Sequence, residues 1–463
     1  MSAHAVLRRK DARRNRARIL DAAERLLAQS PSASLADIAA AAGLSRSTLY
    51  RHFGDRARIV AELADRQWTV ASTAVDGTVS PGRLGRERPV VMDAIQVFDL
   101  VPPPLLPEQL VAEAQRVAGV EVALYVIDID GTHLLRIAGP GRLDDQIPAP
   151  LAVGPELDAD GLSDLRKQFQ EHPGAHVFPL WLRGRAIGVM IAFGRPRQSL
   201  MELARQASAA VTLADRYTDA FAGAQRRKRP KAAAEIQQSL LPPRVSRISG
   251  GEVAGNVLPS YEVAGDWFDV IENHDGVWIT LADGLGGTTR SAASSAVALG
   301  ALRASRRSGA DIGEALVLMH KTLREMPGSR AEMTACVAHW DPLSQQLRVA
   351  NCGHVDPVIV RASGQAEGLR FGKGRGLGGR ARPRPSEKAT SLGPDDRLVM
   401  VSDGVVGSGE GRAGLGFSGL IDAALSSERR TAADTVRRIH MAVLEASSGE
   451  LSDDATAICL AVA

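Results

Sequence analysis

The pattern of apolar positions predicts short helices near the start of the chain. Helical spacing runs through residues 14–29, and a second helical stretch follows Ser34, with Asp37 three residues later as in a capping box. Gly43 interrupts this stretch, and Ser45 precedes a third one. Two short helices around a glycine turn are typical of a helix-turn-helix, so we predict an all-α helix-turn-helix head.

The middle of the chain alternates apolar and polar residues as strands do. Residues 120–139 contain two such stretches joined at Asp130-Gly131, and residues 176–194 repeat the pattern around Arg183-Gly184. Helical spacing then runs through residues 200–221. Two hairpins closed by a helix predict a small α+β domain, which a linker rich in Gly, Pro, Ser and Arg separates from the head.

The C-terminal part contains a further hairpin whose open end carries two acids. Apolar strands flank the turn at residues 273–276, and pairing them across its centre places Asp266 opposite Asp283. Two carboxylates that face each other are unfavourable unless a cation lies between them. The spacing therefore predicts a metal site at this end of the hairpin.

Other acids stand at strand ends in the same region. Asp403 follows a buried stretch, and Asp453 and Asp454 precede the apolar residues 455–463. One acid followed by glycine is most often part of a turn, but four such strand ends in one region are hard to explain as turns. Carboxylate oxygens without a nearby His or Cys cluster select hard cations, so we expect Mg²⁺ or Mn²⁺.

Composition and charge change this picture mainly at the N-terminal end. The 463 residues suggest about three domains, and no apolar run approaches the roughly 18 residues of a membrane span. The three cysteines lack metal-ligand spacing and favour a cytoplasmic protein without a membrane partner. Residues 1–70 carry 13 Lys and Arg against 7 Asp and Glu, which predicts that the head binds a polyanion.

The stretch "SLADIAAAAGLSRSTLYRHFGDRARIVAEL" at residues 34–63 resembles the TetR-type DNA-binding head. The resemblance implies DNA as a partner and a homodimer as the binding unit. It places the following residues on the recognition helix or just after it: Ser45, Arg46, Thr48, Tyr50, Arg51 and His52. A three-helix bundle with a solvated basic face is the alternative.

The order "AGDWFD … ADGLGG … TACVAHWDPLSQQLRVANCGHVDPVIV … LVMVSDGVV … SDDATAICL" resembles the PPM family of metal-dependent protein phosphatases, in its SpoIIE- and RsbU-like branch. The resemblance implies a C-terminal α/β/β/α sandwich that binds two Mn²⁺ or Mg²⁺ ions. Asp283 would bridge the ions, and Gly284 would contribute its backbone carbonyl to one of them. Asp403 and Asp453 would complete the other ion, and Asp266 would hold the pair directly or through water.

The same resemblance implies a serine/threonine phosphatase that acts on a phosphorylated STAS-type anti-sigma-factor antagonist. The end of the middle region resembles a GAF domain, and "EIQQSLLPP" at residues 235–243 resembles the helix that links sensor to catalyst in this branch. Four segments are therefore expected: a TetR-type head at 1–72, a GAF-like sensor at 90–222, a linker helix at 223–245 and a PPM-type domain at 246–463.

Several alternatives stay open. The middle region is either a small-molecule sensor or a structural dimerisation domain. His354, beside a strand turn, is either a proton donor or a structural residue, and the basic, glycine-rich residues 371–388 are either a flap over the site or disordered. For the whole chain, the alternative is a DNA-binding transcription regulator with a non-catalytic phosphatase-like scaffold.

Overall fold

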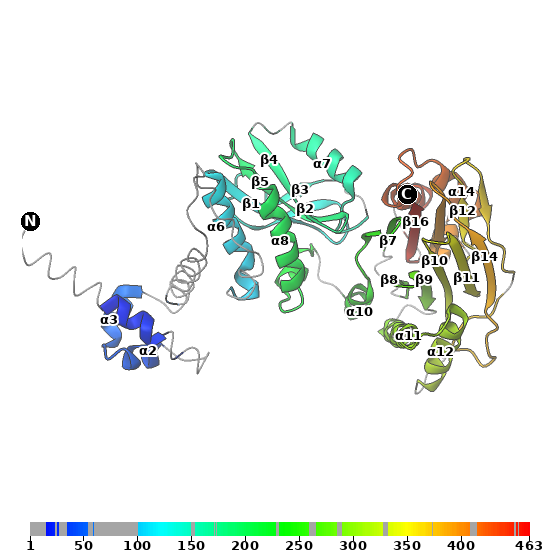
Figure 1. The fold of residues 1–463 in the computed structure, drawn as a ribbon, viewed down its shortest axis with the longest axis horizontal. Helices are drawn as coiled ribbons and strands as arrows, with labels where there is room; N and C mark the ends of the chain where they lie inside the picture. Colours follow the sequence, from blue (N-terminus) through cyan, green and yellow to red (C-terminus); the bar gives the residue numbers. More distant parts are fainter. Residues whose placement is uncertain are drawn as a thin grey trace, which may run out of the picture. The chain divides into compact units, whose positions relative to one another are not determined.

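The computed structural model describes most of the chain beyond residue 100 and parts of the head. The described residues are 15–23, 26, 35–53, 59, 101–149, 153–170, 172, 174–227, 231–258, 265–284, 289–326, 332–372, 374–407, 414–448, 451 and 453–463. The chain divides into two compact units, residues 1–89 and 90–463 (Figure 1). Within the described residues, no helix is both long and apolar enough to cross a membrane.

The first unit contains the predicted helix-turn-helix. Helix α2 (Leu35–Ala41) and helix α3 (Arg46–Phe53) are separated by Gly43, whose φ of 64° lies in the left-handed region that glycine adopts without strain. The Oγ atom of Ser45 accepts a hydrogen bond from the backbone N–H of Thr48 at 3.3 Å, so Ser45 caps α3 as predicted. The proposed cap Ser34 lies outside the described residues.

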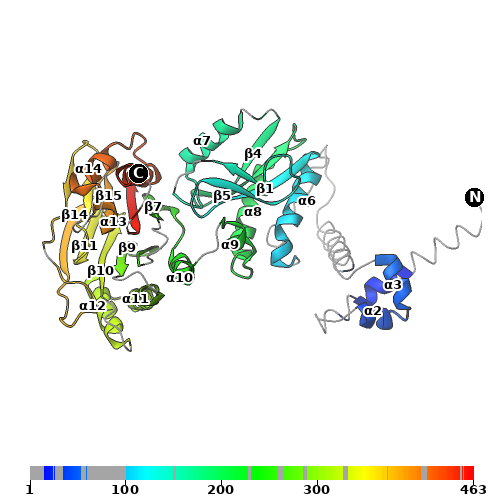
Figure 2. The same ribbon diagram turned by 180° about the vertical axis from the view of Figure 1, so that it is seen from behind.

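The middle region of the second unit is an α+β domain, as predicted. Its five-stranded antiparallel sheet has the order β3-β2-β1-β5-β4. The strands are β1 (Glu121–Ile127), β2 (His133–Ala138), β3 (Gln146–Pro148), β4 (Ala175–Leu182) and β5 (Arg185–Phe193). Both predicted hairpins, β1–β2 and β4–β5, are therefore present. Helices α6 (Leu106–Ala118) and α8 (Met201–Ala214) cover one face of the sheet, and α7 (Ala159–Gln170) covers the other (Figure 2).

The predicted continuous helix over residues 200–221 is wrong. Helix α8 ends at Ala214, and a separate short helix α9 (Ala220–Ala224) follows a turn. The hydroxyl of Thr218 accepts a hydrogen bond from the backbone N–H of Ala220 at 3.2 Å, which gives this N–H a partner other than a helical carbonyl. In the linker segment, α10 (Ala232–Leu240) ends just before the two prolines, because proline cannot continue a helix.

The C-terminal region consists of two antiparallel sheets and flanking helices. One sheet has the order β14-β11-β10-β9-β8 and the other β13-β12-β15-β16-β7-β6. The strands are β6 (Val245–Ile248), β7 (Gly251–Leu258), β8 (Trp267–Asn273), β9 (Gly276–Gly284), β10 (Met333–Asp341), β11 (Gln346–Cys352), β12 (Val358–Val360), β13 (Ala366–Gly368), β14 (Ser386–Ser391), β15 (Arg397–Val401) and β16 (Ala455–Val462). The helices are α11 (Thr289–Arg307), α12 (Ile312–Glu325), α13 (Asp403–Val406), α14 (Gly416–Leu425) and α15 (Ala432–Ala446).

Three apolar layers hold these sheets and helices together. Between the two sheets, Phe268 and Leu281 of one sheet share a buried cluster with Met400 and Leu460 of the other. A second cluster joins α11 and α12 to the outer face of the first sheet. A third joins α14 and α15 to the outer face of the second sheet. The region is therefore the expected α/β/β/α sandwich, because each sheet buries both of its faces.

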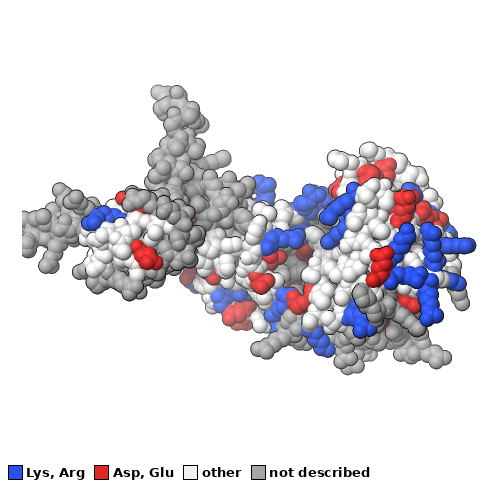
Figure 3. Space-filling view, turned by 90° about the horizontal axis from the view of Figure 1, so that it is seen from below, with Lys and Arg blue, Asp and Glu red and all other residues white. Residues whose placement is uncertain are grey.

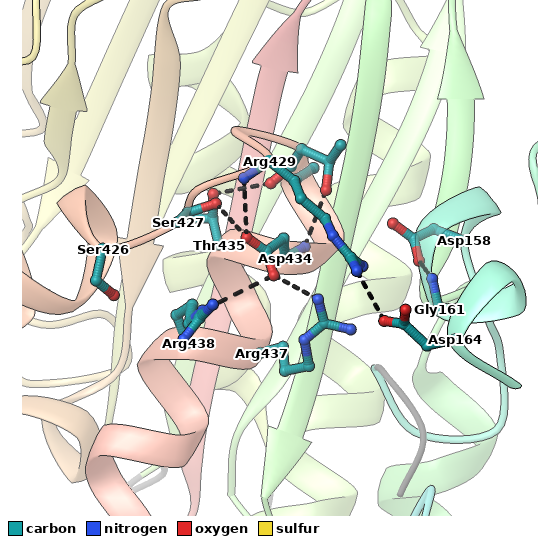
Figure 4. Close-up of polar contacts among 12 residues, drawn as sticks. Asp158, Gly161, Asp164, Ser426, Ser427, Arg429, Asp434, Thr435, Arg437 and Arg438 are labelled. Atoms are coloured by element: carbon teal, nitrogen blue, oxygen red, sulfur yellow. Dashed lines mark hydrogen bonds and ion pairs between the residues drawn. The ribbon is translucent and has the colours of Figure 1, made fainter. Parts of the chain in front are cut away.

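The middle region and the sandwich contact each other within the second unit. The guanidinium of Arg429, in the loop between α14 and α15, donates a hydrogen bond to Asp164 of α7 at 2.8 Å (Figure 4). Glu156 is buried, accepts a hydrogen bond from the backbone N–H of Val245 at 2.8 Å and forms an ion pair with Arg185. Polar groups of the middle region thus fix the first strand of the sandwich.

Candidate active site

The hairpin β8–β9 has the predicted register. Trp267 lies opposite Ala282, and Asn273 lies opposite Gly276. Asp266 immediately precedes the first of these pairs, and Asp283 follows its partner, so the two acids stand at the same open end. The sequence prediction that they face each other is confirmed by this register.

Asp266 and Asp283 are buried together and influence each other strongly. Asp266 is 2% exposed. Burial, followed by the charges of Asp283 and Asp454, raises the pKa of Asp266 well above its ordinary value. Burial and the charge of Asp403 raise the pKa of Asp283 to about 7, with a smaller contribution from Asp453. The acids predicted from separate strand ends therefore form one electrostatically coupled cluster.

The second sheet supplies the other acids of this cluster. Strand β15 ends two residues before Asp403, which is the first residue of α13. A Cβ atom on Gly404 would lie 2.1 Å from the carbonyl oxygen of Asp454, so only glycine allows this close approach. The hydroxyl of Ser402 also lies 3.3 Å from that carbonyl oxygen. Asp403 is thus held against the segment that contains Asp453.

Asp453 and Asp454 play different structural parts. The backbone N–H of Asp454 donates a hydrogen bond to the Oδ1 atom of Asp453 at 2.9 Å. The side chain of Asp454 is 1% exposed and accepts a hydrogen bond from Gln237 at 2.8 Å. The backbone of Asp454 therefore holds the side chain of Asp453, while its own carboxylate is bound to the buried Gln237.

Gln237 is a site residue that sequence reasoning missed. It lies on α10, is 3% exposed, and donates hydrogen bonds to the carbonyl oxygen of Asp266 at 2.7 Å and to the carboxylate of Asp454. The signal was present in the "EIQQSLLPP" stretch, but nothing in the sequence shows which of its two glutamines faces the acids. Thr456 adds a second neutral donor, since its hydroxyl donates a hydrogen bond to the Oδ2 atom of Asp266.

Gly284 lies at the end of β9 with its carbonyl among small polar groups. That carbonyl oxygen accepts a hydrogen bond from the hydroxyl of Ser291 at 3.0 Å, at the start of α11. A Cβ atom on Gly265 would lie 2.3 Å from the same oxygen, so a side chain at position 265 would block it. The predicted carbonyl ligand therefore lies in a cradle of glycine and serine next to the acids.

His354 has the contacts of a structural residue. Its Nδ1 atom lies 2.7 Å from the hydroxyl of Thr334, and its backbone is tied to the side chain of Asn351 by two hydrogen bonds. Burial lowers the pKa of His354 to about 4, although the charge of Asp403 opposes this effect. The ring is therefore neutral near pH 7.

The donor set of the cluster fits a hard divalent cation. Among the described residues, no three His, Cys, Asp or Glu side chains surround one point closely enough to hold a metal ion by themselves. Mg²⁺ is usually bound by one or two carboxylates, and waters and substrate phosphates complete its octahedron. The facing pair Asp266 and Asp283 suits this mode of binding, and both the carbonyl of Gly284 and the acids from the second sheet lie beside it.

The predicted DNA-contacting residues belong to α3 and its cap. The hydroxyl groups of Ser45 and Thr48 lie 2.9 Å apart at the start of the helix, and the carbonyl oxygen of His52 accepts a hydrogen bond from Arg16 at 3.1 Å. Arg46, Tyr50 and Arg51 lie within the α3 segment, and their side chains are outside the described part.

Comparisons with known proteins find matches for two segments of the chain. A family model for "Stage II sporulation protein E (SpoIIE)" matches residues 273–463, and one for "Bacterial regulatory proteins, tetR family" matches residues 19–63. The HTH-type transcriptional repressor LfrR of Mycolicibacterium smegmatis is 43% identical over 63 residues, which are 14% of this chain and 33% of the repressor. The chain thus spans about a third of the length of this relative.

Two solved structures are similar to part of the chain. The RsbU and RsbW domains of a Mycobacterium tuberculosis protein are 23% identical, with a TM-score of 0.41 over 48% of this chain and 63% of that chain. RsbX in complex with magnesium is 14% identical, with a TM-score of 0.38 over 47% of this chain and 98% of that chain. From the family models, the chain carries a TetR-type helix-turn-helix in its N-terminal part and a SpoIIE-type PPM serine/threonine phosphatase domain in its C-terminal part.

Proposed function

We propose that this protein is a metal-dependent serine/threonine phosphatase whose active site is the acid cluster at one edge of the sandwich. The observation that carries the proposal is the convergence of Asp266 and Asp283 from one sheet with Asp403 and Asp453 from the other. Burying like charges together is unfavourable, so an arrangement of this kind is expected where a cation compensates them.

The proposed ligands are those that the family resemblance implied. Asp283 would bridge two Mn²⁺ or Mg²⁺ ions, with the carbonyl of Gly284 on one of them. Asp403 and Asp453 would serve the other ion, and Asp266 would hold the pair. When bound, such ions supply a water of lowered pKa and neutralise charge on a phosphoryl group.

Residues of the chain itself orient this site. Thr456 and Gln237 fix the carboxylate and the carbonyl of Asp266, and the backbone of Asp454 fixes Asp453. A cysteine nucleophile is not available, because all three thiols are buried and burial raises the pKa of each of them. These features support a mechanism in which the chain positions ions and phosphate rather than forming a covalent bond to the substrate.

The proposed substrate is a phosphoserine or phosphothreonine on a STAS-type anti-sigma-factor antagonist, as the SpoIIE- and RsbU-like resemblance implies. The α+β middle region would act as a GAF-like sensor or as a dimerisation domain, and the head would bind DNA as part of a homodimer. The contacts of Glu156 and Asp164 with the sandwich support a role of the middle region in controlling the phosphatase domain.

The first experiment is hydrolysis of p-nitrophenyl phosphate by the full chain with Mn²⁺ or Mg²⁺, repeated with EDTA. Metal-dependent turnover that is lost in Asp283→Asn supports the proposal. If the protein is folded and metal is present but no turnover occurs, the alternative of a DNA-binding regulator with a non-catalytic scaffold is favoured. Phosphorylated STAS proteins encoded nearby are the second set of substrates.

DNA binding is tested separately with the full chain. A gel shift at low salt should show binding that weakens steeply as salt rises, because phosphate contacts release counterions. The double substitution of Arg46 and Arg51 by alanine should weaken this binding, whereas phosphatase activity should stay the same. A full chain that binds no DNA even at low salt contradicts this part of the proposal.

A further inference from the structure

The basic, glycine-rich segment between β13 and β14 is anchored beside the acid cluster. Leu377 is fully buried and exchanges two backbone hydrogen bonds with Met333, at 2.6 and 3.1 Å. Met333 in turn lies opposite Gly284 in the pairing of β10 with β9. The segment therefore passes one strand away from the end of β9 that carries Asp283.

Glycines allow the segment to lie this close. A Cβ atom on Gly374 would lie 2.7 Å from the backbone nitrogen of Gly353, and one on Gly376 would lie 2.8 Å from the carbonyl oxygen of Met333. The ring of His320 accepts a hydrogen bond from the backbone N–H of Gly378 at 3.1 Å. The described part of residues 371–388 is therefore attached to the sheet at Leu377 and to α12 at Gly378.

The side chains that leave this anchored backbone are cationic and exposed. Arg375, Arg380, Arg382 and Arg384 are all exposed, and none of them forms an ion pair with a carboxylate in the described part of the chain. Figure 3 shows Lys and Arg side chains gathered on the side of the sandwich where β14 lies in Figure 1. Unpaired guanidinium groups in water are suited to carboxylates and phosphates of a partner.

A groove continues this surface beyond the anchor. It has a volume of about 780 Å³. It is lined by the end of α11, by one side of α12 as far as Lys321, and by Arg382, Pro385 and Glu387. Three acids also line it. Asp311 and Glu314 accept hydrogen bonds from each other's backbone N–H in the capping box of α12, and Glu387 pairs with Arg348 at 3.1 Å. The cations that remain for a ligand are Lys321 and Arg382.

The distance between the groove and the acid cluster sets the size of the ligand. Ser291, near the start of α11, contacts the carbonyl of Gly284, and Ser305, near its end, lines the groove. A rise of 1.5 Å per residue separates these two positions by about 20 Å along the helix. A folded domain of 100 residues has a radius of gyration of about 13 Å, so a protein substrate can reach both places at once, whereas a small phosphate ester cannot.

We infer that residues 375–384, together with Lys321 in the groove, form a docking surface for acidic residues that flank the phosphoserine of a protein substrate. This inference rests on the proposed phosphatase function. A protein is favoured over a nucleic acid as the occupant because the segment is built against the strand end that carries the site, where a partner must present a single phosphate to the acids. Such a surface selects among phosphoproteins by charge complementarity.

The test uses two phosphoserine peptides of 17 residues with the full chain and Mn²⁺. One peptide carries Asp and Glu at three to seven residues on each side of the phosphoserine, and the other carries Asn and Gln there. The wild type should favour the acidic peptide in kcat/KM by about tenfold at low salt, since several exposed ion pairs act together. The preference should decline toward 0.5 M salt, where the Debye length is below about 8 Å.

The triple variant R380A/R382A/R384A should lose most of this preference. The triple variant R166A/R195A/R216A removes the same charge from exposed positions of the middle region and should keep the preference. Replacing the three loop arginines by lysine should restore part of it, which separates charge from loop structure. Hydrolysis of p-nitrophenyl phosphate by each variant reports separately on the site, so an inactive site would be recognised as failure of the proposed function.

Three results overturn the inference while leaving the phosphatase function intact. The first is equal kcat/KM for the two peptides in the wild type. The second is an acidic preference that survives in R380A/R382A/R384A. The third is a loss of DNA binding in that variant, measured by gel shift, with an unchanged peptide preference, which would assign the surface to nucleic acid.

Discussion

The acid site and the surroundings of Asp434 in α15 both bury carboxylates, but they compensate the charge differently. Asp434 is 1% exposed, accepts a hydrogen bond from Ser427 at 2.8 Å, and forms ion pairs with Arg437 and Arg438 (Figure 4). Burial raises the pKa of Asp434, but the hydrogen bonds from Arg437 and Ser427 outweigh it and leave the pKa below its ordinary value. Its charge is neutralised by the protein itself.

At the acid site, by contrast, the described hydrogen bonds to the side chains of Asp266 and Asp454 come from neutral groups. Thr456 donates a hydrogen bond to Asp266, and Gln237 donates one to Asp454. The charged groups that raise the pKa values of Asp266 and Asp283 are other carboxylates. Three residues after Asp266 in the chain, Asp269 of β8 forms ion pairs with Arg303 and Arg306 at 3.0 and 2.9 Å, so arginines of α11 do reach a carboxylate of this hairpin. The difference shows that arginines compensate the buried charge of Asp434, whereas the carboxylates around Asp266 and Asp283 raise each other's pKa, as expected at a proposed cation site.

The largest expected effect concerns the acids themselves. Asp453→Asn should abolish turnover and weaken metal binding, because a neutral amide is a poor substitute for an anionic ligand. Asp454→Asn should lower activity by about 10- to 100-fold, as expected for a residue that supports a ligand. A Mn²⁺ titration of phosphatase activity measures both, with thermal melts in EDTA as the folding control. Full activity in Asp453→Asn would show that the site has been assembled wrongly.

The second prediction concerns Asp434, whose charge is compensated by Arg437 and Arg438. Asp434→Asn should destabilise the protein by about 2 kcal/mol, because it loses charged hydrogen bonds and leaves two arginines without their partner. The pKa of Asp434 is lower in the folded protein than in the unfolded chain, where it is near 4. Its ionised carboxylate therefore stabilises the fold at pH values above about 4, and this contribution is lost as the pH falls through the pKa of the folded state. The cost should therefore be full at pH 7 and decrease on acidification below about pH 4.

Thermal melts at several pH values measure the effect of Asp434→Asn. Asp422→Asn on the exposed side of α14 is the matched control and should leave the melting temperature unchanged. A melting temperature of Asp434→Asn equal to that of this control at pH 7 would contradict the structural role of the arginine cluster.

The third prediction concerns the neutral donor from the linker segment. Gln237→Ala should lower kcat by roughly tenfold, because the carboxylate of Asp454 and the carbonyl of Asp266 lose their common hydrogen-bond donor. Ser239→Ala, on the exposed side of the same helix, should have no effect. The measurement is steady-state hydrolysis at saturating Mn²⁺. Equal rates in both variants would mean that α10 only tethers the two regions.

The smallest effect concerns the metal-free state. Asp266→Asn should stabilise the protein in EDTA by about 1 kcal/mol at pH 8, because it removes one of several mutually repelling charges. Because the pKa of Asp266 is raised in the folded protein, the wild type loses stability as the pH rises from about 4 through the pKa of the folded state. The stabilisation by Asp266→Asn should therefore be smaller at pH 5 than at pH 8. Melts in EDTA at the two pH values test this sign, and a loss of stability at pH 8 would contradict it.

Much of the local structure could be predicted from the sequence. Both hairpins of the middle region, the β8–β9 register and the acids at strand ends follow from alternation and turn residues, which are local properties. The break after Ala214 was missed because helical spacing continues through it, whereas α8 ends there and a hydrogen bond from the backbone N–H of Ala220 to Thr218 marks the start of α9. Gln237 was missed because its neighbour Gln238 is chemically identical.

The sequence by itself determined which residues end strands and where an acid can stand. The alternation of apolar and polar residues and the positions of the turn residues define both. Only the tertiary structure decided which of these ends meet. Gln237 and Asp454 are 217 residues apart in the chain, and their contact depends on two sheets packing across a shared core. The anchoring of Leu377 on Met333 likewise depends on packing between distant segments. Such contacts form because burial of apolar surface brings the two sheets together. No local pattern of residues shows which distant segments will pack against each other.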